Sequence, residues 1–76
     1  MSIVLSRLPD NKWKVTLGSV ELNPFDTIEL ASAWLSANGT GHHQDDDEID
    51  LALIAMYGYG HTEATFNNGK FIESRP

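Results

Sequence analysis

The residues best suited to chemistry lie between positions 42 and 50, where two histidines precede a run of acids. Residues 45–50 hold five of the eleven carboxylates of the chain. One or two acids at a helix start complement the helix dipole, each contributing about 0.3–1 kcal/mol. Four adjacent acids repel one another, so the dipole accounts for part of the run but not for its density. We therefore interpret the surplus charge as a surface that attracts a basic partner.

A divalent-metal site is the alternative for the same segment. His42, His43, Asp45 and Asp47 offer imidazole and carboxylate donors within a short span, and both are common metal ligands. Their spacing matches neither an EF-hand loop nor the His-Glu-x-x-His pattern of zinc peptidases. The third histidine, His61, would join them only if the fold brings it near.

Catalytic chemistry is not indicated. The chain has no cysteine, and no serine lies in a Gly-x-Ser-x-Gly turn. The glycine pairs at 39–41 and 58–60 lack the lysine of a phosphate-binding loop. A domain of this size is also not expected to form a substrate pocket of about 300 Å³ or more. We predict a protein that is not an enzyme and needs no cofactor.

The charge balance limits the possible partners. The net charge is −6, with only five lysines and arginines in 76 residues. Direct binding to nucleic acid or to an anionic membrane requires clustered basic residues, so both are disfavoured. The first six residues lack the basic start of a signal peptide, and no apolar run approaches about 20 residues. We expect a cytoplasmic protein whose partner is a protein with a basic surface; the oligomeric state is not indicated.

The elements that must position these residues begin with a three-stranded meander. Apolar and polar residues alternate over 13–17 and 20–22, the period of half-buried strands, after a first strand over 3–8. Pro9-Asp10-Asn11 suits the first turn, because proline favours its first central position. Gly18-Ser19 suits the second.

Two helices follow the meander. The first is predicted over 27–37, with Asp26 as its N-cap, Glu29 completing a capping box and Gly39 stopping it. The second begins among 45–47 and runs to Tyr57. Its apolar residues are so numerous that we expect it to be largely buried. A hairpin over 62–66 and 70–73, turning at 67–69, completes the chain.

These elements predict a single α+β domain over residues 1–76. The order is β-β-β-α-α-β-β, and an antiparallel sheet with both helices packed on one face would close a core. The predicted core residues are Val4, Trp13, Val15, Leu17, Leu22, Ile28, Ala31, Leu35, Ile49, Leu53, Met56, Phe66 and Ile72.

The meander, the capped helix at 25–35 and the acidic run at 45–50 together resemble small acidic accessory proteins of bacteriophages, including anti-CRISPR inhibitors. The resemblance implies a stoichiometric inhibitor that blocks a nucleic-acid-handling complex, such as a bacterial defence system. The clustered carboxylates can themselves present negative charge much as a phosphate backbone does, so we expect the protein to act as a nucleic-acid mimic. Our leading hypothesis is a non-enzymatic binder of a basic partner surface. A metal-binding domain or a homo-oligomeric structural subunit remains the alternative. The predicted partner-binding residues are Asp45, Asp46, Asp47, Glu48, Asp50 and Tyr59.

Overall fold

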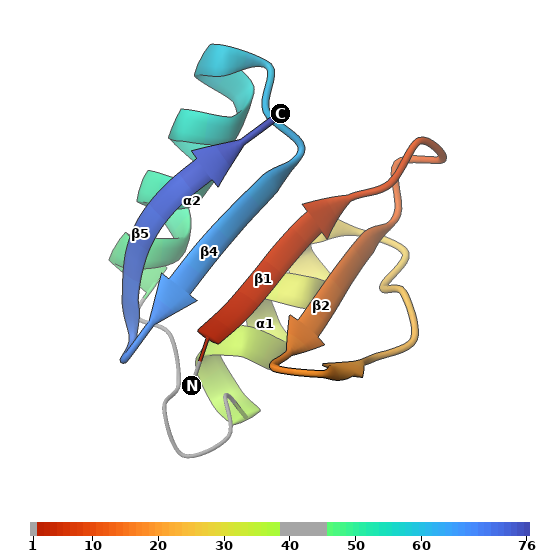
Figure 1. Cartoon of the computed structure of the whole chain (residues 1–76). Helices are drawn as coiled ribbons and strands as arrows, with labels where there is room; N and C mark the ends of the chain where they lie inside the picture. Colours follow the sequence, from red (N-terminus) through yellow and green to blue (C-terminus); the bar gives the residue numbers. More distant parts are fainter. Residues whose placement is uncertain (1, 39–45) are drawn as a thin grey trace.

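The computed structural model describes residues 2–38 and 46–76, and it confirms the predicted α+β fold. The elements follow the expected order (Figure 1). They are β1 (Ser2–Arg7), β2 (Trp13–Leu17), β3 (Val20–Glu21), α1 (Ile28–Asn38), α2 (Asp46–Tyr59), β4 (Glu63–Asn67) and β5 (Lys70–Arg75).

The described strands form one five-stranded antiparallel sheet in the order β3-β2-β1-β4-β5. The first strand of the chain is therefore the central strand, paired with β2 on one side and with β4 on the other. Both helices cover the same face of the sheet (Figure 1), α1 against β2 and α2 against β4 and β5. Neither described helix covers the other face, which is called the open face below.

The predicted turns connect the strands. Pro9 occupies the first central position of a turn in which the Asn11 N–H bonds to the Leu8 carbonyl at 3.0 Å. Asn11 itself has a positive φ of 65°, which asparagine tolerates better than most residues. The last hairpin turns at Asn68 and Gly69, whose φ angles of 53° and 80° are those of a type I′ turn.

The core lies between the inner face of the sheet and the two helices. Alternate residues of each central strand point inward, and one side of each helix covers them. The buried apolar residues are Ile3, Leu5, Trp13, Val15, Ala31, Leu35, Ile49, Ala52, Met56, Ala64 and Phe66. The predicted core residues Leu17, Leu22, Ile28 and Leu53 are partly buried against this cluster.

The predictions for Val4 and Ile72 are wrong. Val4 is half-buried and alternates with the inward-facing Ile3 and Leu5, so it lies on the open face. Ile72 is 58% exposed. The pairing of β4 with β5 shifts register at this point, which leaves Ile72 as an extra residue and lets Phe71 pack against the core instead.

The N-cap of α1 is Thr27 rather than the predicted Asp26. The Thr27 Oγ1 accepts a hydrogen bond from the Leu30 N–H at 3.2 Å. Phe25 is still paired with Trp13 through two backbone hydrogen bonds of 2.7 and 2.9 Å. This pairing keeps the chain extended and delays the helix start by one residue.

The second helix runs two residues further than predicted, through Gly58 to Tyr59. It ends at Gly60, whose φ is 68°. The His61 N–H then bonds back to the Met56 carbonyl at 2.8 Å, as in a Schellman motif. Neither of the two described helices is long and apolar enough to cross a membrane.

Candidate functional site

The acidic run lies at the start of α2, and two of its members form an exposed pair. The helix begins at Asp46, within the predicted range. Asp47 and Asp50 are both exposed and lie three positions apart, so they share one side of the helix. Asp45 and the side chain of Asp46 lie outside the part of the chain that the structure describes.

Glu48 differs from these acids because it has a partner inside the protein. Its Oε1 accepts a hydrogen bond from the Phe71 N–H at 3.1 Å. The side chain is half-buried, and a hydrogen bond to an ionised carboxylate is stronger than one between neutral groups. Glu48 therefore connects α2 to β5, and this role within the fold accounts for one of the clustered acids.

The side of α2 that carries the acid pair also carries large exposed apolar side chains. Leu51, Ile54 and Tyr57 are 51%, 70% and 58% exposed. The prediction that α2 is largely buried is therefore wrong on this side. The sheet covers only the opposite side of the helix, where Ile49 and Met56 enter the core. The outer face of α2 is the set Asp47, Asp50, Leu51, Ile54 and Tyr57.

Tyr59 lies apart from the outer face of α2. It is 76% exposed at the last position of the helix, where helical geometry turns it well away from Ile54. Its ring stacks on that of His61, with centroids 5.4 Å apart. The His61 Nδ1 in turn lies 2.6 Å from the Ser74 Oγ. This contact ties the segment after α2 to β5.

The metal alternative cannot be assembled from the described residues. His42, His43 and Asp45 lie outside them, and Asp47 is exposed on α2. Among residues 2–38 and 46–76, no group of three or more histidine and acidic side chains is arranged to hold a metal ion. His61 is turned toward Ser74 instead. The metal site stays a prediction that rests on the 42–45 segment.

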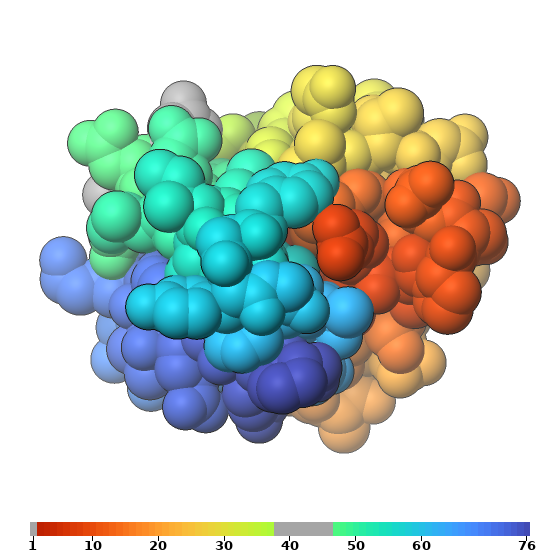
Figure 2. Space-filling view, turned by 90° about the horizontal axis from the view of Figure 1, so that it is seen from above, coloured from red at the N-terminus to blue at the C-terminus, as the bar shows by residue number. Residues whose placement is uncertain are grey.

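Sequence reasoning missed a surface pocket of about 340 Å³. It lies near the end of α2, where the chain after this helix (cyan) passes beside the end of β1 and the β1–β2 turn (red to orange; Figure 2). The expectation that so small a domain lacks a pocket of this size is therefore wrong. No local motif could have revealed it, because distant parts of the chain contribute. Its lining residues are Arg7, Leu8, Pro9, Asn11 and Thr62.

Comparisons of the sequence with models of protein families, and of the chain with curated proteins and with solved structures, find no match.

Proposed function

We propose that this chain is a non-enzymatic binding protein, and that the outer face of α2 contacts a protein partner with an apolar patch bordered by lysines and arginines. One observation carries the proposal: Leu51 and Ile54 are exposed beside the exposed acids Asp47 and Asp50. A helix that presents an apolar stripe to solvent is the usual ligand of a hydrophobic groove on another protein.

The two kinds of side chain would contribute differently to binding. Burial of Leu51 and Ile54 would supply affinity, because apolar surface at the centre of an interface gains most from leaving water. Asp47 and Asp50 would act at the rim, where charges mainly speed the encounter and select the partner. The net charge of −6 favours approach to a basic surface at longer range.

The partner class follows from the same charge. A basic surface is typical of proteins that handle nucleic acid, whose Lys and Arg side chains otherwise meet phosphates. A small acidic protein that occupies such a surface would inhibit the complex by competition. This is the role implied by the resemblance to bacteriophage inhibitors, and it is part of the proposal.

The test is capture of partners from a lysate of the organism that makes the protein, comparing matched variants. Ile54→Lys should weaken capture by about tenfold or more, because it places a charge at the centre of the contact. Asp50→Lys should weaken it less, and more strongly at low salt than at high salt. Glu73→Lys is the control for Asp50→Lys. It changes the net charge by the same amount, but from an exposed position on β5.

If wild type and Ile54→Lys capture the same proteins in equal amounts, the proposal is contradicted. Equal loss with Asp50→Lys and Glu73→Lys would mean that net charge, rather than the outer face of α2, controls binding. The alternative of a homo-oligomeric subunit uses the same exposed apolar side chains. Sedimentation at several concentrations decides it, because a self-association that Ile54→Lys abolishes would assign this face to a second copy.

A further inference from the structure

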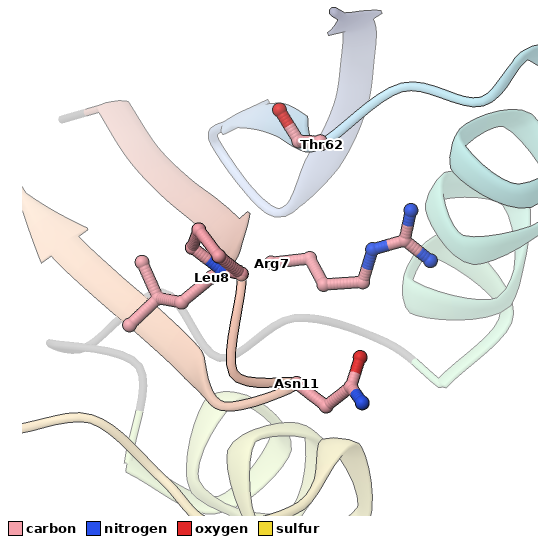
Figure 3. Close-up of a pocket in the computed structure, with 5 residues that line it drawn as sticks. Arg7, Leu8, Asn11 and Thr62 are labelled. Atoms are coloured by element: carbon pink, nitrogen blue, oxygen red, sulfur yellow. The ribbon is translucent and has the colours of Figure 1, made fainter.

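The pocket beside the end of α2 is formed by one cation and a tight turn (Figure 3). Arg7 is the last residue of β1, and its side chain extends from the strand toward α2. Its backbone N–H is fixed to the Thr62 carbonyl at 2.7 Å, so the guanidinium is carried by a paired strand rather than by a free loop.

Among the described side chains, an aromatic ring rather than an acid holds Arg7. The ion pairs among the described residues engage Lys12, Lys14 and Arg75, but none engages Arg7. Its guanidinium carbon lies 5.3 Å from the centroid of the Tyr57 ring. A cation–π contact orients the guanidinium while leaving its N–H groups available to another acceptor.

The Tyr57 ring is itself supported. The Trp13 ring meets it edge-on, with centroids 6.4 Å apart and planes at 64°. Because Trp13 is almost fully buried, the core fixes one side of the arrangement. The orientation of the Arg7 guanidinium is thus fixed before any ligand binds. Most of the other described cations are instead paired with acids.

Asn11 adds a neutral polar group on the same side of the turn. The turn is closed by hydrogen bonds between the Leu8 N–H and the Lys12 carbonyl at 2.8 Å, and between the Asn11 N–H and the Leu8 carbonyl. Figure 3 shows the Asn11 amide projecting toward the space beneath the Arg7 side chain. The neighbouring Asp10 is turned to the backbone, since its carboxylate accepts from the Lys12 N–H at 3.1 Å.

We propose that this pocket binds a monocarboxylate carried on an apolar group. A guanidinium can hold a carboxylate through two parallel hydrogen bonds, and the Asn11 amide can add a third. Leu8 and Pro9, which also line the pocket, provide apolar surface for the rest of the ligand. A phosphate dianion fits less well, because a single cation would face it in a protein of net charge −6. The site shares Tyr57 with the outer face of α2, but it does not require that face to bind a partner.

The carboxylate could belong to a free organic acid or to the C-terminus of a peptide, and the experiment separates these sources. The ¹⁵N NMR spectrum is recorded during titration with benzoate, with benzamide as the uncharged control. A short peptide ending in phenylalanine is then compared with its C-terminally amidated form. We expect saturable shifts at Arg7, Asn11 and Thr62 with benzoate and none with benzamide. Binding of the free-acid peptide alone would assign the site to chain ends.

Matched variants test the contribution of the cation. Arg7→Gln should weaken benzoate binding by about tenfold or more, whereas Arg75→Gln should leave it unchanged, because Arg75 pairs with Glu63 on the open face of the sheet. Asn11→Asp keeps a residue that tolerates the positive φ and places a repelling carboxylate in the pocket. Asn11→Asp should therefore abolish benzoate binding. It keeps the proposal testable if the Arg7→Gln protein does not fold. Equal affinity in wild type and Asn11→Asp, or equal shifts with benzoate and benzamide, would overturn the proposal.

Discussion

The Oε1 of Glu48 accepts a hydrogen bond from the backbone N–H of Phe71 at 3.1 Å, which fastens the first turns of α2 to the outermost strand on that side of the sheet. The exposed backbone of an edge strand invites pairing with other chains, and native proteins often cover it with charged side chains. Glu48 therefore satisfies a backbone N–H of the edge strand β5. Asp47 and Asp50 remain exposed.

Because of this contact, removal of the Glu48 carboxylate should lower the free energy of unfolding more than removal of the other described acids of the run. We expect Glu48→Ala to lower the free energy of unfolding by about 1–2 kcal/mol, because a half-buried, charge-assisted hydrogen bond is removed. Glu48→Gln should cost less, since its amide oxygen can still accept. Urea denaturation measures both, with Asp50→Ala as the control that should change little. Equal stability of Glu48→Ala and Asp50→Ala would contradict the structural role of Glu48.

The two sides of α2 should respond oppositely to substitution. Met56→Ala is expected to cost about 2–5 kcal/mol, because it leaves a cavity in the core. Ile54→Lys should change the unfolding free energy by less than about 0.5 kcal/mol, because Ile54 is 70% exposed. Thermal denaturation distinguishes the two. A large destabilisation by Ile54→Lys would mean that this side of the helix is covered in the native protein.

The capping of α1 can be tested at neighbouring positions. Thr27→Ala should destabilise the protein by about 1 kcal/mol, because the Leu30 N–H loses its acceptor. Asp26→Ala should have a smaller effect, since the exposed Asp26 carboxylate only approaches Lys12 at 3.7 Å. The reverse order of costs, measured by urea denaturation, would restore Asp26 as the N-cap.

The two glycines near the end of α2 should also respond in opposite directions. Gly60→Ala is expected to cost about 1 kcal/mol, since alanine is strained at a φ of 68°. Gly58→Ala should stabilise the protein by about 0.5–1 kcal/mol, because Gly58 lies within the helix and an added Cβ would meet no atom within 4 Å. Calorimetric melting of the two variants checks the signs; a shift in the same direction for both would contradict this account.

The sequence predicted the elements well because each carries a local signal. Alternation identified Trp13 and Val15 as inward-facing, and both are buried. The run Ile3-Val4-Leu5 has no alternation, so the sequence could not indicate which of its residues face the core. For Ile72 the pattern failed because the register shift depends on pairing with β4.

The candidate surfaces were predicted less completely. The acidic run was visible at once, but the exposure of Leu51 and Ile54 depends on how much of α2 the sheet covers. An apolar helix of this length is compatible with full burial or with an exposed stripe. The cation of the pocket, Arg7, lies against Tyr57, fifty positions later in the chain. Only the fold brings these two side chains together.

The central position of β1 has a consequence for synthesis on the ribosome. Among the described strands β1 is made before the others. Its edge on one side is paired by β2, but its edge on the other side is paired only by β4, which is made later. A nascent chain that has emerged as far as α2 therefore carries β1 with one unsatisfied edge. Such edges recruit strands from other chains, and pairing between distant segments is slow to form. A chain whose translation stalls before β4 would thus expose an unpaired β1 edge to other chains.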